Sequence, residues 1–176
     1  MQPFAVRSLI TALIAASLLA GCAGAPTPGV RSTQPMNADE QRRFADSINT
    51  YRVARRLPRI AVSASLMAVA RAHLEDLEQR YRRDTQCNMH SWSNAANWSG
   101  CCYTPDHARA ACMWDKPREI TRGRYSSPGY EIVAHYSDPI TPARALLIWQ
   151  ESPPHLAMLL NMQQWAQHPW QAMGAA

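Results

Sequence analysis

SLMAVARAHLEDLEQRY, residues 65–81, is the stretch that best predicts how this chain folds. Its apolar residues recur every three or four positions, the period of an α-helix with one buried face. The residues on that face are Leu66, Val69, Ala70, Leu74, Leu77 and Tyr81. We expect the helix to begin near Ser63 or Ser65. His73 lies on the same apolar face, where a histidine is usually a hydrogen-bonded core residue.

Three further helices are predicted from their start signals, one before this helix and two after it. Asn37 with Glu40 three residues later matches a capping box, so a helix is expected from there to about Arg55. Thr141-Pro142 and Ser152-Pro153 each place a cap residue before a first-turn proline, and each predicts a further helix. In the second of these, Ser152 is interpreted as a helix cap rather than a nucleophile.

Shorter elements are predicted between and after these helices. Thr104-Pro105-Asp106 combines a cap, a first-turn proline and an acidic first turn, which favours a short helix. Residues 129–136 have a β-like composition, and residues 170–176 are expected to begin a strand. The chain therefore predicts an α+β fold.

The segment from Asp84 to Ser127 is irregular and contains four cysteines, Cys87, Cys101, Cys102 and Cys112. A long irregular segment in a compact domain is usually functional or cross-linked. Four cysteines in an oxidising compartment predict two disulfides. A bond between adjacent Cys101 and Cys102 is strained, so each is expected to pair with Cys87 or Cys112, in either combination. A zinc site is disfavoured because no Cys-x-x-Cys pair is present.

The N-terminal residues 1–21 predict a signal peptide. Arg7 supplies the positive charge, and Leu9 to Leu19 form an apolar run shorter than a membrane span. The run ends in Leu19-Ala20-Gly21-Cys22, which resembles the lipobox of bacterial lipoproteins, whose cysteine is lipidated. An ordinary secretory signal is the alternative. Acyl chains on Cys22 would hold the protein on a membrane.

The remainder of the chain divides into a tether and one domain. Residues 22–36 are rich in Pro, Gly, Ser and Thr, as flexible linkers are, and residues 37–176 have the length of one domain. The net charge is +5 at pH 7, from 18 Lys and Arg against 13 Asp and Glu, without a basic run. Export and this modest charge disfavour nucleic acid as a partner.

Five segments, in order, resemble the CAP superfamily of cysteine-rich secretory, antigen 5 and pathogenesis-related 1 proteins. They are Ile48-Asn49-Thr50-Tyr51-Arg52, the Leu66-to-His73 helix, Met89-His90-Ser91-Trp92, Gly129-Tyr130-Glu131-Ile132 and Trp149-Gln150-Glu151-Ser152-Pro153-Pro154-His155. Two departures are visible. The family usually has Gly-Glu-Asn where this chain has Gly-Tyr-Glu-Ile, and its members typically continue into further strands after Gly174.

The resemblance implies an α-β-α sandwich, here lacking C-terminal strands, with a central cleft of histidine and glutamate side chains. By position, the cleft residues are His90, Glu131 and His155. The two histidines are candidate ligands for Zn²⁺, with Glu131 hydrogen-bonded to one of them. The alternative is a structural network without metal. Glu151 and His73 are weaker cleft candidates.

Several other residues admit two interpretations. Trp92, Trp98 and Trp114 are expected to pack the cysteine-rich segment, and an exposed carbohydrate-stacking role is the alternative. The sequence assigns no partner to His107, His135 or His168. Asn97-Trp98-Ser99 matches the glycosylation sequon, which carries little weight in a bacterial lipoprotein.

Two functions are compatible with these features. The resemblance favours a non-enzymatic binding module of the cell envelope, whose partner is peptidoglycan, a small lipid or an envelope protein. The alternative is a metal-dependent hydrolase with Glu131 or Glu151 as the base. Ala23, where an inner-membrane retention signal would have Asp, points to the outer membrane and its periplasmic face.

Overall fold

Helices α1 (Ala38–Val53) and α2 (Ala64–Gln79) begin where the sequence predicts. The Asn37 side chain accepts hydrogen bonds from the backbone of Asp39 and Glu40, and Glu40 accepts from the Asn37 backbone, so the capping box is confirmed. Ser63 caps α2 by accepting from the Leu66 backbone. Local start signals are therefore sufficient to place both helices.

These elements belong to a computed structural model that describes residues 35–80, 86–95 and 97–176. The described residues lie in a unit that spans Ser32–Ala176. The predicted signal peptide, Cys22 and nearly all of the tether lie outside them. Among the described residues, no helix is both long and apolar enough to cross a membrane.

The remaining helices are short. They are α3 (Ala111–Trp114), α4 (Lys116–Ile120), α5 (Pro142–Glu151), α6 (Pro153–Leu159) and the 3₁₀ helix η1 (Gln163–Gln167). Thr141 caps α5 through its side chain, as predicted. Ser152 occupies the cap position of α6, but its side chain makes no capping hydrogen bond. Ser152 is therefore the residue at the helix start, as predicted, but it does not stabilise α6 through a side-chain hydrogen bond.

Two predicted short elements are wrong. Thr104-Pro105-Asp106 forms a turn, because the Asp106 carboxylate accepts from the Thr104 hydroxyl at 2.6 Å and from the Ala108 backbone at 3.1 Å. The following helix begins only at Ala111. Residues 129–136 are extended but are assigned to no strand, since their backbone joins no ladder.

Strands β1 (Ala61–Val62) and β2 (Ala172–Met173) form a two-stranded parallel sheet. The strand predicted within residues 170–176 is therefore present, although short. Gly174 follows β2 against the first turn of α2. A Cβ at this position would lie 2.1 Å from the Leu66 carbonyl carbon, so only glycine fits the approach. Together, helices and a small sheet confirm an α+β fold.

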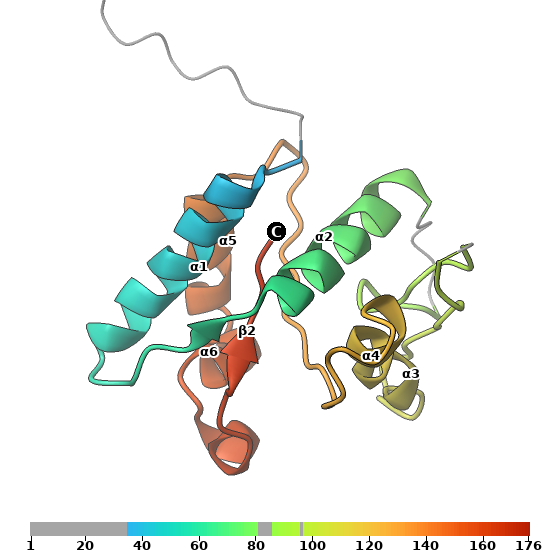
Figure 1. The fold of residues 1–176 in the computed structure, drawn as a ribbon. Helices are drawn as coiled ribbons and strands as arrows, with labels where there is room; N and C mark the ends of the chain where they lie inside the picture. The colour runs from blue at the N-terminus through green and yellow to red at the C-terminus, as the bar shows by residue number, and fades with distance from the viewer. Residues whose placement is uncertain (1–34, 81–85, 96) are drawn as a thin grey trace, which may run out of the picture. The chain divides into compact units, whose positions relative to one another are not determined.

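A first core packs α1 against α5, α6 and the sheet (Figure 1). The rings of Phe44 and Trp149 are stacked with centroids 5.6 Å apart. Asn49 and Arg52, on the same helix, are buried structural clamps. Asn49 exchanges two hydrogen bonds with the Ile60 backbone at 2.7 and 3.0 Å, and Arg52 donates to the Leu159 carbonyl at 2.5 Å.

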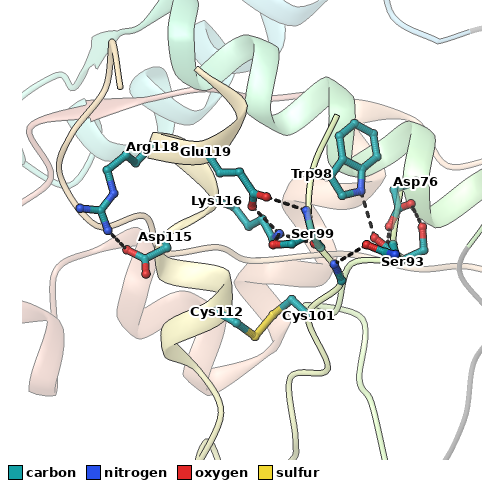
Figure 2. A network of polar contacts seen from close by, with 12 residues as sticks. Asp76, Ser93, Trp98, Ser99, Cys101, Cys112, Asp115, Lys116, Arg118 and Glu119 are labelled. Atoms are coloured by element: carbon teal, nitrogen blue, oxygen red, sulfur yellow. Dashed lines mark hydrogen bonds and ion pairs between the residues drawn. A yellow bond between two sulfur atoms is a disulfide. The ribbon is translucent and has the colours of Figure 1, made fainter. Parts of the chain in front are cut away.

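A second core lies in the cysteine-rich segment, around Trp92, Cys101, Tyr103 and Met113. Two disulfides, Cys87–Cys102 and Cys101–Cys112, cross-link it, so the adjacent cysteines pair with different partners as predicted. Figure 2 shows the polar contacts beside the second disulfide. There the buried Lys116 ammonium donates to Glu119 at 2.6 Å and to the Ser99 carbonyl at 2.5 Å, so its charge is compensated.

Candidate functional site

A partly buried carboxylate holds two histidine side chains. Glu131, in the extended segment after α4, accepts from His73 Nδ1 through Oε1 at 2.5 Å and from His90 Nδ1 through Oε2 at 3.0 Å. His73 comes from the middle of α2, and His90 comes from the loop that follows α2. One carboxylate thus holds two imidazoles that are 17 positions apart in the sequence.

His73 is fixed on every side. Its side chain is only 2 % exposed, and its Nε2 lies 3.0 Å from the Ser91 carbonyl oxygen. The Trp92 ring stacks on it, with centroids 4.3 Å apart and planes inclined by 11°. The helical period correctly predicts His73 in the core. It also faces the cleft, which the sequence treats as the weaker of two interpretations.

The buried Asp76 carboxylate holds in place the loop that contains Ser91 and Trp92. Asp76, one turn after His73 on α2, accepts from both the backbone and the hydroxyl of Ser93. This anchors Ser91 and Trp92, the two residues of this loop that contact His73. Sequence patterns assign no role to Asp76, because its partner lies 17 positions away in an irregular segment.

The charges of the site stabilise one another. Burial alone would raise the pKa of Glu131, but the hydrogen bonds and charges of His73 and His90 lower the pKa to about 2. Burial alone would lower the pKa of His73, but the neighbouring Glu131 carboxylate outweighs it and raises the pKa. An ion pair between Glu131 and a protonated His73 is therefore favoured over neutral partners.

His155 differs from the other two histidines. It lies near the start of α6, and its buried Nδ1 has no hydrogen-bond partner among the described residues. Burial lowers the pKa of His155, and the charge of His90 lowers it further. Of the two histidines expected near Glu131, His90 contacts its Oε2, while Oε1 contacts His73.

A cavity of about 770 Å³ adjoins this network. His73 and Glu131 line it, and most of its wall is apolar, with Val69 and Leu77 of α2, Ile132 of the extended segment and Trp149 of α5. The volume lies within the range of ligand pockets, which combine apolar walls with a few polar groups. The cavity is therefore a mainly apolar pocket in which one part of the wall carries the hydrogen-bonded, charged pair His73 and Glu131.

The other candidate residues lie apart from this network or have other partners. Glu151 is exposed at the end of α5. His107 is hydrogen-bonded to the Tyr103 hydroxyl at 2.8 Å. Trp98 packs against Trp92, whose ring also stacks on His73, whereas Trp114 is 39 % exposed.

The described residues provide an incomplete donor set for a metal. No group of three or more His, Cys, Asp or Glu side chains with suitable spacing occurs in residues 35–80, 86–95 and 97–176. Glu131 is already engaged by two imidazoles, and His90 uses Nδ1 to contact it. A structural zinc site with four protein ligands does not fit this arrangement.

Comparison with protein families agrees with the positions of these residues. The model of the cysteine-rich secretory protein family, CAP, matches residues 45–164, which contain His73, His90, Glu131 and His155. No curated protein and no solved structure has detectable similarity to the chain. The match covers more than half of the chain and includes every residue of the histidine–glutamate network. The chain therefore belongs to the CAP family.

Proposed function

We propose that this protein is a non-enzymatic binding module of the cell envelope that holds a small lipid in its cavity. The observation that carries the proposal is the apolar cavity with the Glu131 carboxylate and His73 at its edge. Apolar walls suit an acyl chain or a ring system, and the polar corner suits a head group with hydrogen-bonding atoms. Peptidoglycan and an envelope protein are larger than this cavity admits as whole ligands.

The fixed geometry of the polar corner supports binding rather than turnover. Each Glu131 oxygen is engaged by an imidazole, and the lowered pKa keeps the carboxylate ionised. A general base works best with a pKa near the operating pH, far above the value of this carboxylate. The CAP-type α-β-α sandwich implied by the family is part of the same proposal.

Binding of a fluorescent palmitate analogue to the purified protein tests the proposal. Saturable binding is expected for the native chain, and it should be lost in Ala70→Trp, because Ala70 lines the cavity and an indole fills part of it. Leu147→Trp is the matched control, since Leu147 is exposed on α5 and lies outside the cavity. Equal binding by both variants would contradict the proposal.

Lipid anchoring is the second part of the proposed function. The run from Leu9 to Cys22 supports cleavage before Cys22 and acylation of its thiol, with the protein held at the outer membrane and facing the periplasm. Incorporation of radiolabelled palmitate into the native chain, and its loss in Cys22→Ala, is the expected result. If the native chain is secreted without an acyl group, the N-terminal segment is an ordinary secretory signal and lipid anchoring is refuted.

A metal-dependent hydrolase is the alternative function, and one observation favours it. Burial lowers the pKa of His155 and so favours the neutral imidazole that binds metals, and its buried Nδ1 has no partner among the described residues. His90 and His155 would hold a zinc ion, which would activate a water molecule when bound. Calorimetric titration with Zn²⁺ should then show uptake that both His90→Ala and His155→Ala abolish. Uptake that neither variant changes excludes this site.

A further inference from the structure

Four aromatic rings from three separate segments meet on the surface. Trp114 ends α3, Tyr130 lies in the extended segment, and Trp165 and His168 belong to η1 and its C-terminal cap. Tyr130 contacts the other three, with ring centroids 5.9 Å from Trp114, 5.2 Å from Trp165 and 5.7 Å from His168. We name Trp114, Tyr130, Trp165 and His168 the aromatic platform.

The platform leaves much of its ring surface open. Trp114 is 39 % exposed and Tyr130 is 41 % exposed. Their rings meet edge to face, with Tyr130 inclined by 60° to Trp114 and by 74° to Trp165. Edge contact covers only part of a ring and leaves the remainder to a partner. Adjoining exposed rings of this kind mark an interaction surface.

The C-terminal segment that contributes Trp165 and His168 is polar but uncharged. Residues 152–176 contain no Asp, Glu, Lys or Arg. Exposed Gln163, Gln164 and Gln167 surround Trp165 in the sequence, and each amide offers both donors and acceptors. The acid next to Trp114, Asp115, is paired with Arg118 at 2.6 Å. The chemistry on offer is therefore ring faces combined with neutral hydrogen-bonding groups.

This combination favours one class of partner. Nucleic acids and anionic membranes require Lys or Arg, which residues 152–176 lack. A pyranose sugar presents C–H groups, which pack on aromatic rings, and hydroxyls, which bond to amides. We propose that the aromatic platform binds an uncharged pyranose chain.

The platform adjoins the cavity but does not depend on it. Tyr130 directly precedes Glu131, and Tyr130 and His168 also line the cavity. A sugar chain on the platform therefore lies beside the cavity and shares Tyr130 and His168 with it, whereas Trp114 and Trp165 do not line the cavity. The saccharide site is thus additional to the proposed lipid site, and an experiment can refute either proposal without refuting the other.

Calorimetry and tryptophan fluorescence with chitohexaose and with cellohexaose test the proposal on the full chain in detergent. At least one of the two is expected to bind with a Kd below about 1 mM. Trp114→Ala and Trp165→Ala should each weaken binding about tenfold, whereas Tyr130→Phe, which keeps the ring, should change it less than about threefold. Tyr136→Ala is the matched control, because Tyr136 is similarly exposed but contacts Arg144 outside the platform.

Three results would overturn the proposal. One is no binding of either saccharide by a native chain whose near-ultraviolet circular dichroism shows a folded state. Another is binding that Tyr136→Ala weakens as much as Trp114→Ala does. The third is a dimer in sedimentation equilibrium that Trp114→Ala dissociates, which would make a second copy the partner. In Ala70→Trp we expect saccharide binding to persist and binding of the palmitate analogue to be lost. This result would separate the saccharide site from the lipid site.

Discussion

Replacing Glu131 by glutamine should produce a loss of stability that depends strongly on pH. Glutamine preserves the shape and can still accept one hydrogen bond, but it removes the charge opposite His73. The native carboxyl changes its pKa from 4.5 to about 2 on folding. At 1.36 kcal/mol per pKa unit, this corresponds to about 3 kcal/mol of stability from the ionised carboxylate. The raised pKa of His73 describes the same interaction and is not added to it.

The sign of each shift sets the pH window. A lowered carboxyl pKa contributes stability above 4.5, and this stability is lost as the pH falls toward about 2. A raised imidazole pKa contributes stability below 6.5, and this stability is lost as the pH rises through the higher value in the folded protein. The difference in the free energy of unfolding between the native chain and the Glu131→Gln variant should therefore be largest between about pH 4.5 and 6.5.

Urea unfolding followed by tryptophan fluorescence, with disulfides intact, measures the difference between pH 2.5 and 8. We expect about 3 kcal/mol at pH 5.5, or roughly 10 °C in Tm, falling to about 1 kcal/mol at pH 2.5 because the folded carboxyl is still largely ionised there. Above the folded pKa of His73, about 1 kcal/mol should remain from neutral hydrogen bonds. Glu151→Gln, at an exposed helix end, is the control and should change little. A difference that stays constant across this range would refute the ion pair.

Three further substitutions test the scaffold. Gly174→Ala should cost about 3 kcal/mol in urea unfolding, because its Cβ would meet the Leu66 backbone, whereas Gly100→Ala, with its nearest neighbour at 3.5 Å, should cost under about 1 kcal/mol. Asn49→Ala leaves the Ile60 N–H and carbonyl unpaired and should cost about 2–4 kcal/mol in thermal unfolding; an unchanged Tm would contradict the clamp. Replacing Cys101 and Cys112 together by serine should cost about 3 kcal/mol, and mass spectrometry should still find Cys87 and Cys102 oxidised.

The parts of the fold that depend on local chemistry could be predicted from the sequence. Asn37, Ser63 and Thr141 cap helices through backbone groups two or three residues away, so short patterns are sufficient. The turn at Thr104 was predicted as a helix because its residues suit either structure. Asp106 bonds to its own neighbours there, and a sequence pattern does not rank those bonds against a helical turn.

The candidate site shows a different limit. The family resemblance predicted His90, Glu131 and His155, and the helical period placed His73 inside. The pairing of His73 with Glu131 spans 58 positions and ends in a segment without regular structure, where no periodicity reports which way a side chain points. Asp76 and the Trp92 stack were missed for the same reason. Contacts between an irregular segment and a helix face depend on tertiary packing, which local patterns do not encode.

The two disulfides are interleaved along the chain, and this affects how the protein must mature. In order, the first cysteine pairs with the third and the second with the fourth: Cys87 with Cys102, and Cys101 with Cys112. In a chain exported from its N-terminal end, the adjacent Cys101 and Cys102 emerge together, so Cys87 can pair with either of them before Cys112 has emerged. A bond between Cys87 and Cys101 would leave Cys102 and Cys112 with the wrong partners, and thiol–disulfide exchange is needed to release it. Efficient production should therefore depend on a disulfide isomerase as well as on an oxidant.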